Sequence, residues 1–198
     1  ANLQATYDFT NWLSYNINLA YDNSQAVRRT GIDPLLWFSA IGYDPDEGRG
    51  NGRAVIDNRY LTSSLMEHTI NMQRPLLANG TIDVLAGFSY QEFEDRGDWL
   101  QAEYFITNEI PLVDNVDGVD NSGDNKAFSA ASDRSIEELQ SFFGRVNYNY
   151  DDRYLLTVNF RADGSTKFGE NNKYGYFPSV AAAWRLSEED FFPDLISV

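Results

Sequence analysis

The sequence lacks cysteine altogether, has a single histidine and contains no long apolar run. Without cysteine there is no disulfide framework and no thiolate metal site, and one histidine leaves too few of the usual ligands for zinc. No run of about 18 or more apolar residues occurs, so no transmembrane helix is expected. A membrane protein is not thereby excluded, because a strand of a transmembrane barrel needs only about 9–11 residues and alternates in polarity.

Basic residues are also scarce. The chain has 15 Lys and Arg against 30 Asp and Glu, which gives a formal net charge of −15. Such a chain is a poor partner for nucleic acid, whose phosphates call for clustered Lys and Arg. Aromatic residues are plentiful, and the 12 Tyr, 13 Phe and 4 Trp favour β-strands and interfaces. The length of 198 residues suits one domain or part of one.

The clearest structural pattern lies between Arg145 and Leu186, in the stretch RVNYNYDDRYLLTVNFRADGSTKFGENNKYGYFPSVAAAWRL. Apolar and polar side chains alternate over 142–150 and again over 154–161, with the tight polar turn Asp151-Asp152 between them. A third alternating run, 179–185, follows Pro178. Strict alternation predicts strands, because successive side chains of a strand point to opposite faces, and two such runs joined by a short turn predict a hairpin.

Four further alternating runs, 1–8, 12–22, 59–73 and 81–92, bring the predicted strands to seven. The connections 9–11, 74–80 and 151–152 are short, whereas 23–58, 93–138 and 163–178 are long. An antiparallel up-and-down meander with short turns on one side and long loops on the other is typical of outer-membrane barrels. We therefore predict an all-β fold whose apolar face meets lipid and whose Asn-, Thr- and Ser-rich face lines a wet lumen.

The aromatic residues support this orientation. In a membrane barrel they form girdles at the two membrane interfaces. The predicted girdle on the short-turn side contains Tyr7, Phe9, Trp12, Tyr15, Tyr148, Tyr150, Tyr154 and Trp184. The predicted girdle on the long-loop side contains Tyr21, Tyr60, Phe88, Tyr90 and Phe160.

The segments RVNYNYDDRYLLTVNFRADGSTKFG and YGYFPSVAAAWRLSEEDFF, within 145–192, strongly resemble the SusC/RagA family of TonB-dependent outer-membrane transporters. YLTSSLMEHTINMQ and IDVLAGFSYQEFE also look like barrel strands of that family. The resemblance implies that residues 1–198 are part of the β-barrel domain, seven strands of about 22, without the plug, the TonB box or the C-terminal strand. It implies a multi-pass barrel in the cell outer membrane that imports glycans or peptides and is coupled to TonB. It further implies a SusD-like surface lipoprotein as a lid, contact with the lipid bilayer and no enzymatic activity.

The candidate substrate-binding residues lie in the predicted loops and on the lumen face. The loop aromatics are suited to stacking on sugar rings or to meeting the lid, although packing within the loop explains them equally well; they are Trp37, Phe38, Tyr43, Trp99, Tyr104 and Phe105. Arg145 and Arg161 fall on the lumen face and are candidates for holding an anionic group. Ion pairs with the plug or with neighbouring strands are the plainer explanation for both arginines.

Other chemical groups have simpler structural roles. Asp114, Asp117, Asp120 and Asp124 offer oxygen ligands for calcium, but their spacing lacks the EF-hand order, and solvated surface charge is the default reading. The lone His68 is expected to point outward between Met66 and Ile70, and Asp151-Asp152 is expected to form a turn rather than an acid–base pair. No catalytic residue and no cofactor are predicted.

Two other classes of protein remain open from the residues. A soluble carbohydrate-binding β-sandwich would show polar residues on its outward faces and no ordered alternation of short and long connections. A passive porin-type barrel shares the strand pattern and differs from a TonB-dependent transporter by lacking a plug.

Overall fold

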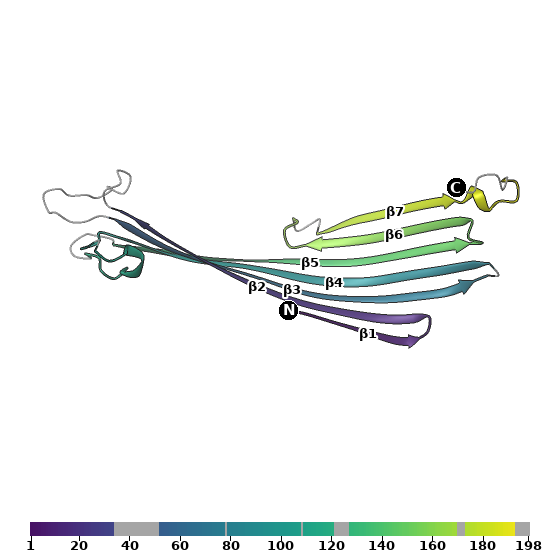
Figure 1. Ribbon diagram of the computed structural model, residues 1–198, viewed down its shortest axis with the longest axis horizontal. Helices are drawn as coiled ribbons and strands as arrows, with labels where there is room; N and C mark the ends of the chain where they lie inside the picture. Colours follow the sequence, from purple (N-terminus) through teal and green to yellow (C-terminus); the bar gives the residue numbers. More distant parts are fainter. Residues whose placement is uncertain (34–51, 78, 108, 121–126, 170–172, 193–198) are drawn as a thin grey trace. The chain divides into compact units, whose positions relative to one another are not determined.

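The computed structural model describes residues 1–33, 52–77, 79–107, 109–120, 127–169 and 173–192. Its strands are β1 (Asn2–Thr10), β2 (Leu13–Ile32), β3 (Arg53–Leu76), β4 (Gly80–Glu103), β5 (Phe128–Tyr150), β6 (Tyr154–Ser165) and β7 (Tyr174–Trp184). They form one sheet in the order β1 to β7, so each strand pairs with its neighbours in the sequence (Figure 1). The predicted all-β, antiparallel meander of seven strands is confirmed.

Helical structure in the described ranges is limited to two single 3-10 turns, η2 (Leu112–Asp114) and η3 (Leu186–Glu188). No helix there is long and apolar enough to cross a membrane.

The chain divides into two compact units. The first contains Ala1–Asp22, Ser63–Phe93 and Glu137–Val198, and the second contains Asn23–Thr62 and Glu94–Ile136. Strands β2, β3, β4 and β5 contribute residues to both units. The strands expected from the sequence lie mostly in the first unit, whereas the second corresponds mainly to two of the three segments expected to be long loops, 23–58 and 93–138.

In the first unit the register separates two faces. On one face Val146 pairs with Val158, and Val158 with Val180; Tyr150 pairs with Tyr154, and Tyr154 with Trp184. On the other face Asn147 pairs with Thr157, and Asn159 lies between Arg145 and Ser179. We call these the apolar face and the polar face. Cross-strand pairs of similar polarity stabilise a sheet. This register therefore places apolar residues opposite apolar ones on one face and polar residues opposite polar ones on the other.

The apolar face has no cover among the described residues. Phe142, Leu156, Phe160, Val180 and other large side chains on it are exposed, and Val180 reaches 69%. In water a sheet buries such a face against a second layer, because contiguous apolar patches of this width are unfavourable there. In a bilayer the acyl chains supply the apolar surroundings, so the face needs no further protein layer.

Aromatic rings gather at the short-turn end of the apolar face. Tyr150 and Tyr154 have ring centroids 6.3 Å apart, as do Tyr154 and Trp184. Glu189, just after η3, accepts hydrogen bonds from the Tyr154 hydroxyl (2.7 Å) and the Trp184 Nε1 (2.9 Å). These bonds and the nearby Arg153 hold the pKa of Glu189 below its ordinary value. The ionised carboxylate of Glu189 thus binds the segment after β7 to the rings of Tyr154 and Trp184.

The turn between β5 and β6 is built as the sequence predicts. Asp151 and Asp152 have φ angles of 55° and 52°, in the left-handed region that Asp tolerates better than most residues. The Asn149 Nδ2 donates to the Asp152 Oδ1 at 2.6 Å, and Arg153 pairs with Asp151 at 3.3 Å. Both carboxylates therefore stabilise the turn, as expected for turn formers.

The predicted strand ends were wrong in the second unit. β2 continues to Ile32 and β4 to Glu103, while β3 begins at Arg53 and β5 at Phe128. The segments 23–58 and 93–138 are therefore partly strand. Ion pairs stabilise these extensions: Arg59 bonds to Asp95 (2.6 Å) and to Asp133 (3.1 Å), which joins three strands. The hydrogen bond that Arg59 donates to the Asp95 carboxylate raises the pKa of Arg59.

The loop predicted over 163–178 is also too long. β6 runs to Ser165 and β7 begins at Tyr174, so Pro178 lies inside β7 and pairs with Phe160. Proline is tolerated where its missing N–H faces away from the ladder. β7 is the last strand in the sheet order and pairs only with β6, so one of its sides makes no ladder bonds within the described chain.

The second unit has a small core of its own. It consists of Ala54, Ala102, Phe105, Leu112, Val119 and Ala127. Phe105 is 2% exposed and forms a bridge with Val119. The segment after β4 therefore folds back on itself around Phe105.

Substitutions at two glycines of the first unit would test how closely a side chain can be packed between neighbouring strands. A Cβ on Gly87 would lie 2.3 Å from the Phe143 ring, whereas a Cβ on Gly144 would meet only the Leu85 carbonyl oxygen at 3.5 Å. We expect Gly87→Ala to displace the ring and destabilise the intact barrel by about 1–3 kcal/mol. Gly144→Ala is the matched control and should change stability little. Measuring the temperature at which each variant loses its folded electrophoretic mobility checks this, and equal shifts would contradict it.

Candidate functional site: the polar face of the first unit

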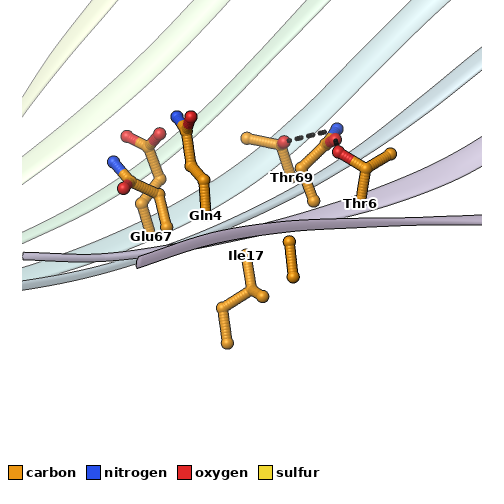
Figure 2. A pocket seen from close by; sticks show the side chains of 8 residues that line it. Gln4, Thr6, Ile17, Glu67 and Thr69 are labelled. Atoms are coloured by element: carbon orange, nitrogen blue, oxygen red, sulfur yellow. Dashed lines mark hydrogen bonds between the residues drawn. The ribbon is translucent and has the colours of Figure 1, made fainter. Parts of the chain in front are cut away.

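The polar face of the first unit carries the groups that can meet a solute. Figure 2 shows Gln4, Thr6, Glu67 and Thr69 on one side of the sheet and Ile17 on the other. Gln4 and Thr6 come from β1, and Glu67 and Thr69 come from β3. Asn16 and Asn18 of β2 line the same face, so three strands place polar side chains there. The arrangement follows from the register, in which Gln4 pairs with Asn18 and Thr6 with Asn16.

A shallow groove of about 300 Å³ lies on this face, and Ala5 and Ile17 complete its lining. The Thr6 hydroxyl donates to the Asn16 Oδ1 at 2.6 Å, and the Asn16 Nδ2 donates to the Thr69 Oγ1 at 3.4 Å (Figure 2). The Asn18 Oδ1 is buried and has no hydrogen-bond partner among the residues that the structure describes. The groove thus offers amides, hydroxyls and the single carboxylate of Glu67, which suits a solute or protein segment rich in hydrogen-bonding groups.

The polar face of β5, β6 and β7 is a ladder of side-chain hydrogen bonds. The Arg145 Nε donates to the Asn159 Oδ1, and the Asn159 Nδ2 donates to the Ser179 Oγ, both at 3.1 Å. The Thr157 hydroxyl donates to the Asn147 Oδ1 at 2.9 Å. Each bond joins adjacent strands, so the ladder fixes the orientation of Arg145 while leaving it exposed.

Arg161 is held much more firmly than Arg145. Its Nε donates to both carboxylate oxygens of Asp163, at 2.7 and 2.8 Å, and its guanidinium also donates to the Ser141 Oγ at 3.2 Å. The guanidinium lies 5.7 Å from the centroid of the Phe143 ring. Asp163 balances the charge of Arg161, whereas Arg145 forms no ion pair with any described residue.

The sequence therefore placed both arginines on the correct face but could not separate their surroundings. Arg161 forms an ion pair, but its partner Asp163 lies on the same strand β6, so ion pairs with the plug or with neighbouring strands stay a prediction for both arginines. The role of either arginine in holding an anionic group stays a prediction. Glu67 was missed as a lining residue; its only signal was its place next to His68, which puts it on the opposite face.

The predicted loop aromatics are dispersed. Trp37, Phe38 and Tyr43 lie outside the described residues. Trp99 lies within β4 rather than in a loop, because the strand extends to Glu103, and its side chain is 37% exposed. Tyr104 follows the strand with a φ of 62° and packs against the core around Phe105. Phe105 itself is buried in that core, so it is not available for stacking on a sugar. Packing within the loop is thus the role the structure gives Tyr104 and Phe105, and sugar stacking stays a prediction for the others.

The acidic residues do not converge in the described part of the chain. Asp114 pairs with Arg29 at 3.4 Å, and the Asp120 amide donates to the Tyr104 carbonyl oxygen at 2.8 Å. Asp124 lies outside the described residues, within which no group of three or more His, Asp or Glu side chains is arranged to hold a metal ion. Solvated surface charge therefore stays the default interpretation of Asp114, Asp117, Asp120 and Asp124, and the weaker calcium alternative is untested.

His68 lies where its place in the strand predicts. Its Nδ1 shares a hydrogen bond with the Tyr15 hydroxyl at 2.5 Å, and the two rings are stacked at 5.9 Å. Tyr15 pairs with Tyr7 in the register, on the opposite face from Thr6 and Asn16. His68 therefore belongs to the apolar face and takes a packing role there.

No family model matches the sequence. TonB-dependent receptor P3 of Formosa agariphila is 31% identical over 194 residues, which cover 98% of this chain and 18% of that protein. TonB-dependent receptor P26 of the same bacterium is 40% identical over 173 residues, 86% of this chain and 16% of its own length. TonB-dependent receptor SusC of Bacteroides thetaiotaomicron is 47% identical over 57 residues, 29% of this chain and 6% of that protein. The chain thus spans less than a fifth of these curated relatives.

Solved structures give the same result for the fold. The RagAB peptide transporter superposes with a TM-score of 0.78 at 18% identity, over 94% of this chain and 19% of that one. The RagAB peptide importer in its closed-closed state superposes with a TM-score of 0.77, over 96% of this chain and 20% of that one. The sheet therefore has the fold of a piece of a transmembrane β-barrel. By sequence the chain belongs to the SusC/RagA family of TonB-dependent receptors, as its strands 145–192 indicated.

The different surroundings of the two arginines generate a paired prediction. We expect Arg145→Ala in the intact protein to weaken binding of an anionic substrate about tenfold or more, the loss of one charge-assisted hydrogen bond. Arg145→Lys keeps the charge and should lose less. Arg161→Ala removes an exposed ion pair and should cost up to about 1 kcal/mol of stability.

Calorimetric titration and thermal melts of the purified intact variants separate the two effects. Equal loss of binding in Arg145→Ala and Arg161→Ala would contradict the assignment of distinct roles.

Proposed function

We propose that the chain forms part of the wall of an outer-membrane transporter that imports nutrients with energy delivered through TonB. The observation that carries the proposal is the pairing of an exposed apolar face with a hydrogen-bonded polar face on the same seven strands. That pattern matches a strand ladder between lipid and a wet interior. The names of the relatives, TonB-dependent receptors, support the energy coupling.

The orientation follows from the connections. Barrels of this kind keep short turns on the periplasmic side and longer loops outside. The β1–β2, β3–β4 and β5–β6 turns, with the ring cluster of Tyr150, Tyr154 and Trp184, would then lie at the periplasmic interface. The β2–β3, β4–β5 and β6–β7 connections would then belong to the cell surface.

The substrates we propose are glycans or peptides. The neighbouring solved structures are a peptide transporter and a peptide importer. The amides and hydroxyls around Asn16, Asn18 and Thr69 would hydrogen-bond either kind of solute. Binding and release require no covalent step, so we expect no enzymatic activity. A plug and the remaining strands would come from outside this chain.

We also propose that the partner is a surface lipoprotein of the SusD kind, which would cover the long-loop side. The exposed Ile106 (72%), Ile110 (48%) and Phe128 (43%) of the second unit give that side apolar side chains for a contact. The candidate aromatics Trp37, Phe38, Tyr43 and Trp99 would serve the lid, the substrate or both.

The alternatives fit less well. A soluble sandwich needs a second sheet over the apolar face, and the described strands form one sheet only. A passive porin would keep the same wall, and the relatives named TonB-dependent receptors weigh against it.

The test uses the intact protein in outer-membrane fractions. We expect anomalous electrophoretic mobility until the sample is boiled, together with a lipoprotein that co-purifies in mild detergent. A folded barrel without a lipoprotein would refute the proposed partner while leaving the barrel. A protein confined to the soluble fraction with no shift in mobility would refute the transporter and favour the sandwich.

A further inference from the structure

A small polar cavity interrupts the apolar face near its long-loop end. Gln140 pairs with Gly164, and Gly164 with Tyr174, two residues beyond the row of Phe142, Ala162 and Tyr176. All these positions lie on the apolar face. Around them is a cavity of about 190 Å³, lined also by Tyr90, Glu138, Ser165, Thr166 and Lys173. Polar groups that face outward at this level need an explanation other than contact with acyl chains.

The cavity is firmly built. The Tyr174 hydroxyl donates to the Gln140 Oε1 at 2.7 Å, and the Tyr90 hydroxyl donates to the Glu138 Oε1 at 3.0 Å. The Tyr174 ring lies against Gly164, where a Cβ would come within 2.7 Å of it. The Glu138 amide donates to the Thr166 Oγ1 at 3.0 Å, which fixes the wall nearest the connection to β7. Side chains from β4, β5 and β7 are thus oriented before any ligand arrives.

We propose that this cavity binds the sugar headgroup of a glycolipid in the outer leaflet of the membrane. The inference rests on the proposed function, because it takes the apolar face as lipid-facing and the long connections as the outer side. At that depth a headgroup lies directly outside the acyl chains, and interfacial tyrosines are placed to meet it. The apolar face below the cavity, from Phe142 and Phe160 onward, accommodates the acyl chains of the same molecule.

The chemistry of the lining favours sugar hydroxyls over phosphate. Glu138 carries a negative charge into the cavity, and Lys173 is the single cation among its lining residues. A carboxylate accepts hydrogen bonds from hydroxyls and repels a phosphate, while an amide such as that of Gln140 both donates and accepts. The Tyr174 ring, 39% exposed, offers an apolar surface for the C–H face of a sugar. The headgroup therefore contributes through its hydroxyls, and removing a phosphate should change the affinity little.

The experiment is native mass spectrometry of the intact, detergent-purified protein with defined lipids. Diphosphoryl and monophosphoryl lipid A present the same sugar with different charge, and phosphatidylglycerol presents charge without a sugar. The glucosamine disaccharide without acyl chains tests a free solute as the source. Tyr174→Phe removes one hydroxyl and keeps the ring, and Gln140→Leu removes the amide. Glu137→Gln, next to Glu138 but on the other face of β5, is the matched control.

We expect both forms of lipid A to bind alike and more tightly than phosphatidylglycerol. Each cavity variant should weaken that binding about three- to tenfold, the usual effect of losing one hydrogen bond, while Glu137→Gln stays at the wild-type value. Folded electrophoretic mobility confirms that the variants still form a barrel. Equal binding of all lipids, or no effect of the cavity variants, would overturn the proposal and leave the barrel intact. Binding of the free disaccharide as tightly as lipid A would assign the cavity to a soluble sugar instead.

Discussion

The structure depends on one constraint: a wide apolar face must meet something apolar. Rows such as Val146, Val158 and Val180 cross three strands and remain exposed. In hydrocarbon an unpaired backbone amide or carbonyl costs several kcal/mol. Strands β2 to β6 satisfy this demand, since each is hydrogen-bonded to a neighbour on both sides. Lipid on one face and ladder bonds along the edges together explain why these strands need no covering layer.

The polar face is the consequence of the same alternation. Once apolar side chains occupy every second position, the intervening residues all point to the other side and must find polar partners. Arg145, Asn159 and Ser179 do so across three strands. Such a surface is ordered by its own hydrogen bonds and presents polar groups, as the proposed wall of a transport pathway requires. In the extended parts of β2 to β5 the side chains also find polar partners, and there the partners are charged. Arg59, for example, donates hydrogen bonds to both Asp95 and Asp133.

The sequence predicted the strands that have one face in lipid, because only there does polarity alternate. Where both faces carry charged or small residues, as in 94–103 and 128–136, alternation vanishes, so the sequence predicts loops where the structure has strands. The start of β7 was predicted wrongly for a different reason. Pro178 suggests the end of a loop, but a strand at the end of the sheet order tolerates a residue without an N–H. The pairing of Arg161 with Asp163, and the exposed state of Arg145, depend on side-chain geometry that residue spacing does not encode.

The central claim is that successive residues of one strand face lipid and water in turn. Because this chain has no cysteine, single cysteines can be placed along β6 of the intact protein, with any cysteine elsewhere replaced. Thr157→Cys and Asn159→Cys should react with a membrane-impermeant maleimide in outer-membrane vesicles that have been opened. Val158→Cys and Phe160→Cys should resist it, and a fluorophore there should be quenched by brominated lipids. Equal reaction at all four positions, without lipid quenching, would contradict the account and place this sheet in water.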